Sequence, residues 1–386
     1  MNKRLVIVLT MLPHHGGKYQ YSLSVLNSFR DQSHFKIVVL YYDEHWNNLI
    51  PKEFHKIKIN KDIKIIQGIK LLIGLIPFGD ILIRLLSNIF FSIHKKIHDI
   101  KPDLVIYPGG ETLSYENKYK SVVPVFDIMH KYESYPEINS FRINYSRNLH
   151  YKRVVKNASI VFVDSEVGKL QLKESYPCKN SLKIIKLPYT APPYVFTSIK
   201  GSFKIDLPKK YLFYPAQFWK HKNHKNLIEA LEILKTKHKV KIDLVLVGTK
   251  KNYYLNVLDV IKKYGLENQI HYFNYVQNDE LVYLYKNAFA LIMTSTLGPT
   301  NIPPLEAIAL GCPVIVSDVY AAKEQLDDSA LYFNPKDSED ISNKILGLLK
   351  NKKLREDIIR KGFIKSSQYS QSQFKTTLLN SLITYS

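Results

Sequence analysis

Short apolar runs alternate with longer helical patterns in this chain, and the whole alternation occurs twice. In the first half the apolar runs are Leu5–Met11, Phe35–Tyr42, Asp103–Pro108, Val122–Met129, Ala158–Ser165 and Leu182–Pro188. In the second half they are Tyr211–Ala216, Ile242–Gly248, Ile270–Val276, Phe289–Ser295, Cys312–Asp318 and Ala330–Pro335. Continuous apolar runs are typical of parallel strands that helices cover on both faces. The sequence therefore predicts an α/β protein with two doubly wound, Rossmann-like sheets.

Between these two halves lies a segment without periodicity. Residues 188–208 are rich in proline and glycine, which is typical of a hinge. We therefore expect a first domain over residues 1–190, a hinge over 191–208 and a second domain over 209–365. A final helix over 366–386 is expected to pack back on the first domain. Helical spacing in the first half falls at Tyr19–Arg30, Asn144–Lys156 and Glu166–Tyr176.

The segment Gly298–Asp318 has the pattern of a loop, a short helix and a buried strand. Asn301 can cap a helix, and a proline at 303 or 304 suits the first helical turn. The helix is expected from about Leu305 to Leu310, and Gly311 supplies the left-handed residue that ends it.

Free backbone N–H groups at Thr300–Ile302, together with the helix dipole, would then form an anion site. Glu306 lies close enough to this site to reach hydroxyls beside a bound phosphate. The same pattern also fits an ordinary loop, helix and strand with a hydrogen-bonded carboxylate.

Three further patches follow predicted strands, where doubly wound folds bind their ligands. Gly16 and Gly17 follow the first strand and allow close approach to the backbone, although an ordinary turn is an alternative. Lys222 precedes a predicted helix and can neutralise a phosphate, or it is a solvated lysine. Asp127 and His130 can act as acid, base or hydroxyl anchor, or form a structural pair.

The formal net charge of +21 is spread over both halves and favours anionic partners. No basic run with interleaved aromatic residues or zinc-finger spacing indicates a nucleic-acid module. Two cysteines are too few for a disulfide framework, so we expect a cytoplasmic protein. The apolar N-terminus is interpreted as a first strand and not as a signal peptide, because no small-residue cleavage site follows. We expect no metal or other cofactor, since no Asp-x-Asp pair is present to hold a divalent ion.

Residues 63–100 form a strongly apolar segment with lysines on both sides. Pro77, Asp80 and Arg84 interrupt it, so it is too short to span a membrane. A helix from about residue 80 that packs on the first sheet explains it. The alternative is that the region Leu71–Phe78 lies on an anionic membrane surface.

Taken in order, these patches resemble the GT-B-fold retaining glycosyltransferases of family 4 (group 1), in particular a bacterial surface-polysaccharide subset. The most specific parts are PAQFWKHKNHKNLIEAL, GPTNIPPLEAIALGCPVIVSD and ALYFNPKD. The resemblance implies that Gly16 and Gly17 approach the donor phosphates and that Lys222 contacts the diphosphate. It implies that Glu306 holds the ribose hydroxyls and that Thr300, Asn301 and Ile302 complete the phosphate cradle.

The chain also departs from the family pattern. Gly298 replaces the first glutamate of the E-x7-E pair, Gln217 replaces an arginine, and Phe126 replaces the histidine before Asp127. Gln217, Tyr275 and Gly298 are assigned to the donor site. Lys222, Glu306, His130 and Asp127 are the residues expected to act in catalysis.

The expected activity is transfer of a sugar from a nucleoside-diphosphate donor to a hydroxyl, with retention and without metal. The expected acceptor is a lipid-linked glycan in surface polysaccharide (O-antigen, capsule or lipopolysaccharide) synthesis, at the inner face of the plasma membrane. A GT-B sugar-nucleotide 2-epimerase and a non-catalytic sugar-nucleotide-binding protein are the alternatives.

Overall fold

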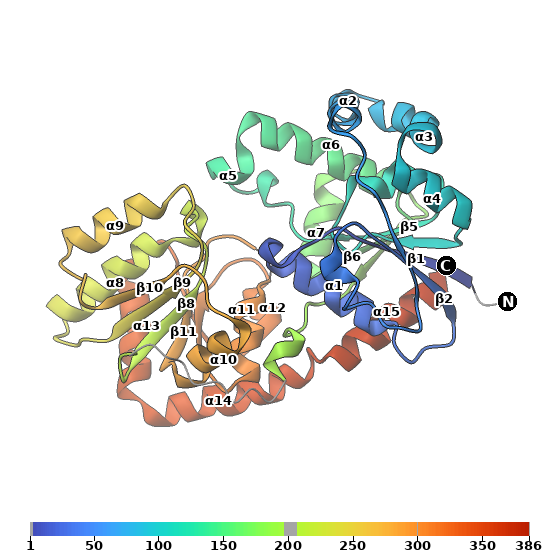
Figure 1. Cartoon of the computed structure of the whole chain (residues 1–386). Helices are drawn as coiled ribbons and strands as arrows, with labels where there is room; N and C mark the ends of the chain where they lie inside the picture. Colours follow the sequence, from blue (N-terminus) through green and yellow to red (C-terminus); the bar gives the residue numbers. More distant parts are fainter. Residues whose placement is uncertain (1–2, 197–206, 299, 386) are drawn as a thin grey trace. The chain divides into compact units, whose positions relative to one another are not determined.

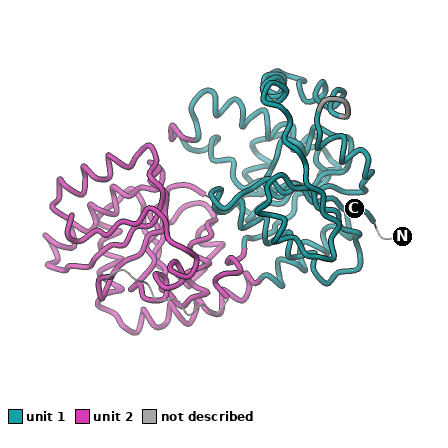
Figure 2. The backbone as a smooth tube through the Cα atoms, in the orientation of Figure 1, with its two compact units in different colours: residues 1–134, 138–189, 371–386 teal, residues 135–137, 190–370 magenta. Residues whose placement is uncertain are grey.

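The computed structural model describes residues 3–196, 207–298 and 300–385, which fold into two units (Figure 2). The first unit contains Met1–Ser134, Ile138–Tyr189 and Gln371–Ser386, and the second contains Tyr135–Glu137 and Thr190–Ser370. Most of the predicted hinge falls on residues 197–206, outside the described residues.

A sheet of seven parallel strands forms the centre of the first unit, in the order β3-β2-β1-β4-β5-β6-β7 (Figure 1). The strands are β1 Lys3–Leu9, β2 Phe35–Tyr41, β3 His55–Lys58, β4 Leu104–Ile106, β5 Ser121–Val125, β6 Ile160–Val163 and β7 Lys183–Lys186. The six predicted strands are present. The edge strand β3 was not predicted, because its sequence HKIK is polar and mostly exposed.

Alternate residues of β1 show why this sheet reads as continuous apolar runs. Leu5, Ile7 and Leu9 pack into the core on one face, together with residues of the helices α1 (Gly17–Ser28) and α15 (Gln371–Tyr385), while Val6 and Val8 pack into the core on the other. Successive strand side chains point to opposite faces, so a strand with helices on both sides must be apolar throughout. The strand pattern in the sequence thus follows from burial on two faces.

Before the second sheet the chain forms the helices α1 Gly17–Ser28, α2 Lys64–Gly74, α3 Gly79–Phe90, α4 Ser92–Ile100, α5 Pro136–Asn139, α6 Phe141–Asn157 and α7 Glu166–Ser175. Residues of α1 pack into the core on one face of the sheet, and residues of α4, α6 and α7 pack into the core on the other. The C-terminal helix α15, Gln371–Tyr385, contacts α1 in the first unit (Figure 1). The helices predicted from Tyr19, Asn144 and Glu166 correspond to α1, α6 and α7.

The second unit contains six parallel strands in the order β10-β9-β8-β11-β12-β13. They are β8 Tyr211–Pro215, β9 Asp243–Val247, β10 Ile270–Phe273, β11 Ala290–Met293, β12 Val314–Ser317 and β13 Ala330–Phe333. Each lies inside its predicted range. The helices are α8 His224–Thr236, α9 Tyr254–Lys263, α10 Asn278–Asn287, α11 Ile302–Ala309, α12 Ala322–Leu326, α13 Ser338–Lys350 and α14 Lys352–Ser367.

Helix α11 begins three residues earlier than predicted, directly after Asn301. Asn301 occupies the capping position in an extended conformation, but its side chain makes no capping hydrogen bond. At the other end Gly311 has φ +74°, so the prediction of a left-handed residue there is confirmed. A Cβ at Gly311 would lie 2.8 Å from the Phe363 ring.

Replacing Gly311 with alanine is expected to lower the free energy of unfolding by roughly 1–2 kcal/mol, because an L-residue is strained at positive φ. Urea unfolding monitored by circular dichroism measures the change. Gly347→Ala is the matched control, since Gly347 lies within α13 and a Cβ there meets nothing within 4 Å. That control is expected to raise stability by up to about 1 kcal/mol. Equal destabilisation by both variants would contradict the argument.

Candidate functional site

In the second unit the strand order reverses between β8 and β11. The chain runs outward from β8 to β10 and then returns to β11 on the other side of β8. In open parallel sheets, ligands bind outside the carboxyl ends of the strands at such a reversal. The loops after β8 and β11 carry Lys222 and the residues before α11, so the sheet brings these two predicted patches together.

Side-chain and backbone hydrogen bonds join the two loops. Thr294 Oγ1 donates to the carbonyls of Lys222 and Asn223, each at 3.2 Å, and the Thr296 N–H donates to the His221 carbonyl at 2.9 Å. Tyr214 Oη donates to the Lys222 carbonyl at 2.8 Å. The backbone of Lys222 is therefore fixed by both strands.

The Lys222 ammonium itself is half-buried and weakly partnered. Its Nζ lies 3.5 Å from Ser295 Oγ, and within the described ranges it forms no ion pair with a carboxylate. Burial lowers the pKa of Lys222 to about 8. An unneutralised cation at this end of the sheet is suited to an anionic ligand.

The N-terminus of α11 is less open than the sequence predicted. The Asn301 N–H donates to Gln325 Oε1 at 3.1 Å, and Gln325 Nε2 donates back to the Asn301 carbonyl at 2.7 Å. The expectation that all amides of Thr300–Ile302 are free is thus wrong at Asn301. Gln325 lies in α12, and sequence spacing gave no sign of this contact.

Glu306 is buried and both of its carboxylate oxygens accept hydrogen bonds. Tyr194 Oη donates to Oε1, and Tyr285 Oη donates to Oε2 at 2.5 Å. Burial raises the pKa of Glu306, and the two tyrosine hydroxyls oppose that shift. Glu306 lies within α11, after the predicted anion site, and each of its carboxylate oxygens already accepts one tyrosine hydroxyl.

The remaining donor-site candidates of the second unit differ in their surroundings. Gly298 has φ +102° and precedes α11, where a Cβ would lie 3.2 Å from the Asn301 amide group. Gln217 follows β8 and accepts a hydrogen bond from Trp219 Nε1 at 2.9 Å. Tyr275 follows the edge strand β10 and is 67% exposed. Among the described residues, no hydrogen bond, ion pair or ring contact of the Tyr275 side chain is found.

In the first unit, Gly16 and Gly17 lie at the start of α1 as predicted. Gly16 has φ +58° and caps the helix, and a Cβ there would meet nothing within 4 Å. Glycine is therefore required by the backbone conformation. Both residues are exposed at the carboxyl end of β1.

Asp127 and His130 form part of a structural network. Asp127 is ion-paired with Arg147, whose Nε donates to His130 Nδ1 at 3.2 Å. His130 is buried, and its Nε2 lies 2.9 Å from Tyr176 Oη. Burial lowers the pKa of His130 to about 4, so the imidazole is neutral near pH 7. This geometry favours a structural role for Asp127 and His130 over a role as acid, base or hydroxyl anchor.

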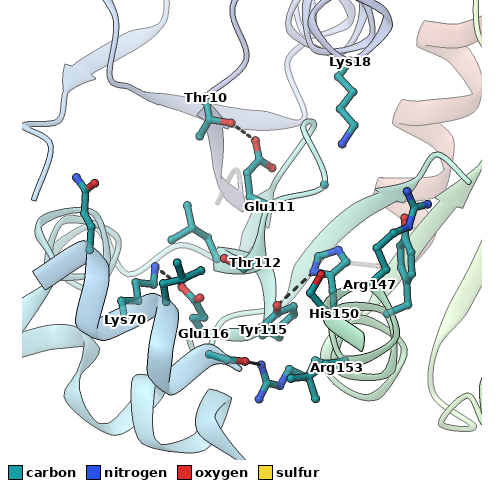
Figure 3. Close-up of a pocket in the computed structure, with 18 of the residues that line it drawn as sticks. Thr10, Lys18, Lys70, Glu111, Thr112, Tyr115, Glu116, Arg147, His150 and Arg153 are labelled. Atoms are coloured by element: carbon teal, nitrogen blue, oxygen red, sulfur yellow. Dashed lines mark hydrogen bonds and ion pairs between the residues drawn. The ribbon is translucent and has the colours of Figure 1, made fainter. Parts of the chain in front are cut away.

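A cavity of about 870 Å³ lies within the first unit at its own strand reversal, between β1 and β4. Figure 3 shows Thr10, Lys18, Glu111 and Arg147 around it. Glu111 and Thr10 were not identified from the sequence. The signal that could have found Glu111 is its position after Gly109 and Gly110, directly beyond a buried strand.

Glu111 stands out among the cavity residues. Its Oε1 accepts a hydrogen bond from Thr10 Oγ1. Its Oε2 is buried and has no hydrogen-bond partner among the described residues. Burial raises the pKa of Glu111 to about 7. The carboxyl group can therefore exchange a proton near neutral pH.

Residues 195–364 match the family model of glycosyl transferases group 1. The matched range lies within the second unit and includes Lys222, Gly298–Ile302 and Glu306.

Among proteins of known function, the chain is 29% identical to O-antigen chain mannosyltransferase B of Escherichia coli. That match covers 44% of this chain and 45% of the relative, so the chain spans about half of its length. It is 24% identical to N,N'-diacetylbacillosaminyl-diphospho-undecaprenol alpha-1,3-N-acetylgalactosaminyltransferase of Campylobacter jejuni, over 94% of each chain. The solved structure of Anabaena HepE in complex with UDP and glucose superposes with a TM-score of 0.71. At 15% identity it covers 99% of this chain and 100% of that chain, which shows a shared two-domain fold.

Replacing Lys222 with methionine is expected to raise the free energy of unfolding at pH 7 by roughly 1–3 kcal/mol, because folding desolvates a charge that has no counter-ion among the residues the structure describes. The pKa of Lys222 is lower in the folded state, so wild-type protein gains stability as pH rises through about 8 toward 10.5. The difference between variant and wild type should therefore shrink over this range. Chemical unfolding at several pH values measures it.

Lys225→Met is the matched control, because Lys225 is 50% exposed on α8 and pairs with Glu229. It is expected to leave stability unchanged within about 0.5 kcal/mol. A Lys222→Met protein that is no more stable than wild type at pH 7 would contradict the interpretation.

Proposed function

Because residues 195–364 belong to the group 1 glycosyl transferases and the chain has the GT-B fold, we propose that it transfers a sugar from a nucleoside-diphosphate donor to a glycan hydroxyl. The observation that carries this proposal is the unpaired ammonium of Lys222 at the reversal of the second sheet. A diphosphate needs a cation at that place, and the lysine has no counter-ion among the described residues.

During transfer, negative charge accumulates on the departing diphosphate. Lys222 and the amino end of α11 stabilise that charge, so the protein supplies the neutralisation that a metal ion provides in other transferases. The sugar leaves as an oxocarbenium-like species, and transfer proceeds with retention of configuration. Glu306 binds the ribose by exchanging a tyrosine hydroxyl for a ribose hydroxyl.

A thermal-shift screen of UDP-, GDP- and dTDP-sugars tests donor binding. A ligand that binds the folded state raises the melting temperature in proportion to its occupancy. At least one donor is expected to raise it, followed by release of the nucleoside diphosphate when acceptor is added. Epimerised donor, or binding without turnover, would overturn the transferase assignment.

Replacing Lys222 with alanine is expected to lower kcat at saturating donor by roughly 10²–10³-fold, the loss typical of one donor to a developing negative charge. Coupled detection of the released nucleoside diphosphate measures it. Lys225→Ala, three residues along on the exposed side of α8, should retain wild-type turnover. Wild-type turnover by Lys222→Ala would remove the central role of this lysine.

We propose that the acceptor is a membrane-borne glycolipid of surface polysaccharide synthesis, and the names of the O-antigen mannosyltransferase and the undecaprenol-linked relative support this proposal. The α2–α3 hairpin, Lys64–Phe90, supports this assignment, because most of its described apolar side chains are exposed, with Ile83 buried. Helix α2 has no buried residue. Each of the following residues at the hairpin is at least 41% exposed: Ile63, Ile65, Ile69, Leu71, Leu72, Ile76, Phe78, Ile81, Leu82 and Leu85.

The inner side of the hairpin is attached to the first unit by polar groups. Arg153 pairs with Asp80 at 3.0 Å and donates to the carbonyl of Ile76 at 2.7 Å. Lys70 pairs with Glu116 at 2.6 Å, and Arg84 donates to the Tyr115 carbonyl at 2.8 Å. A helical hairpin that faces water normally packs its apolar side chains inward and exposes its polar ones. The α2–α3 hairpin largely shows the opposite arrangement, which contact with a membrane surface explains.

No described helix is both long and apolar enough to cross a bilayer. Attachment through the hairpin is therefore proposed to occur at the membrane surface. The predicted helix from about residue 80 is present as α3, and Ile93 and Ile97 of α4 pack into the core of the first sheet, so that interpretation is confirmed for the later part of the segment. The exposed side chains of α2 and of the first turns of α3 are the part that the membrane interpretation addresses.

The double substitution Leu72→Glu and Leu85→Glu is expected to abolish flotation with anionic liposomes at low salt, since it places two carboxylates on the exposed apolar face. Wild-type protein should float with vesicles that contain phosphatidylglycerol. Leu255→Glu is the matched control, because Leu255 is 71% exposed on α9 of the second unit. Wild-type protein that stays unbound would contradict the assignment of the hairpin to a membrane.

A further inference from the structure

The cavity of the first unit contains a carboxylate and an ammonium group that the donor site does not use. Glu111 extends from the loop after β4, and Lys18 extends from the first turn of α1 toward the same space (Figure 3). These loops are neighbours because β1 and β4 pair with each other. The two side chains thus converge at the strand reversal, where a ligand of the first sheet would bind.

Both groups retain unused hydrogen-bonding capacity. Glu111 Oε2 is buried and unpartnered among the described residues, although buried carboxylate oxygens normally accept a hydrogen bond. Lys18 lies 5.3 Å from the centre of the Phe126 ring and makes no ion pair with a described carboxylate. In contrast, the cavity residues Lys70, Arg147 and Arg153 are all committed to ion pairs.

The carboxylate is held in place by its surroundings. Thr10 Oγ1 donates to Oε1, which leaves Oε2 as the oxygen without a partner. A Cβ at residue 109 would lie 2.3 Å from Glu111 Oε1, so Gly109 makes the room that the carboxylate occupies. The unpartnered Oε2 therefore belongs to a side chain whose position is set by the Thr10 hydrogen bond and by the space at Gly109.

We propose that Glu111 and Lys18 form a sugar-hydroxyl site, in which Glu111 Oε2 accepts a hydrogen bond from a hydroxyl of the acceptor glycan and the Lys18 ammonium donates to an adjacent oxygen. A carboxylate beside an ammonium matches neighbouring sugar hydroxyls, since each hydroxyl both donates and accepts. The assignment rests on the proposed function, because it takes the ligand of the first unit to be the glycan that receives the sugar.

The site should depend on pH in a defined direction. Among the described residues, Thr10 makes the side-chain hydrogen bond to Glu111, and Lys18, Tyr42 and Tyr107 interact with its charge. Glu116, Arg147 and His150 line the same cavity. His150 is neutral, because burial lowers its pKa to about 3. Arg147 is neutralised by its ion pair with Asp127. Glu111 is thus the group that changes charge near pH 7, and its carboxylate form accepts the stronger hydrogen bond.

Saturation-transfer NMR on the full chain tests the proposal with the methyl glycosides of mannose, glucose, galactose, N-acetylglucosamine and N-acetylgalactosamine as probes. At least one glycoside is expected to bind wild-type protein more tightly at pH 8 than at pH 6. Glu111→Gln should weaken that binding by about tenfold or more and remove its pH dependence. Glu174→Gln, an exposed glutamate of α7, is the matched control and should bind as wild type does.

Donor binding distinguishes failure of this site from failure of the proposed function. Glu111→Gln protein that keeps its thermal shift with a nucleotide sugar, but loses the glycoside, supports both assignments. If Glu111→Gln protein loses glycoside binding and wild-type protein shows no thermal shift with any nucleotide sugar, the transferase assignment is overturned and the hydroxyl site is retained. Unchanged glycoside binding in Glu111→Gln, or no glycoside bound by wild-type protein, overturns the hydroxyl site.

Discussion

The pairing of β8 with β11 is the constraint on which the second unit depends. These strands are separated by two complete strand-helix units, yet they lie side by side in the sheet. Their pairing places the turn that carries Lys222 against the loop that leads into α11. The hydrogen bonds of Thr294 and Thr296 to that turn then fix where the ammonium can lie. The Lys222 ammonium has no counter-ion among the described residues, and hydrogen bonds to the carbonyls of His221, Lys222 and Asn223 hold its backbone in place.

The first unit repeats this arrangement with different side chains. There β1 pairs with β4, and the loops beyond them contribute Thr10, Lys18 and Glu111 to one cavity. A doubly wound sheet thus produces a ligand position by topology alone, and the residues after the strands decide its chemistry. The proposed phosphate site of the second unit rests on the Lys222 ammonium, which has no carboxylate partner among the described residues. The proposed hydroxyl site of the first unit rests on Glu111, whose Oε2 has no hydrogen-bond partner among them.

The sequence predicted local features well and non-local contacts poorly. Apolar runs located twelve of the thirteen strands, because strands buried on both faces carry their signal in consecutive residues. The edge strand β3 was not predicted, because its side chains are mostly exposed and give no apolar run. The turn at Gly311 was predictable from the helix-ending pattern, whereas the bond from Asn301 to Gln325 joins different elements. For the same reason no spacing rule could show that Tyr194 and Tyr285 bind Glu306.

The two tyrosines on Glu306 have a consequence for selectivity. In this structure each carboxylate oxygen already accepts a hydrogen bond from a phenol, so the buried charge is compensated before any ligand arrives. A sugar diol that displaces a phenol exchanges one hydroxyl partner for another, with little net change in hydrogen bonding. Glu306 can then distinguish a ligand that donates a hydroxyl to it from a ligand that displaces the phenol without donating a hydrogen bond. In the proposed donor site, such a residue confers specificity without tight binding, which suits the release of a nucleotide after each transfer.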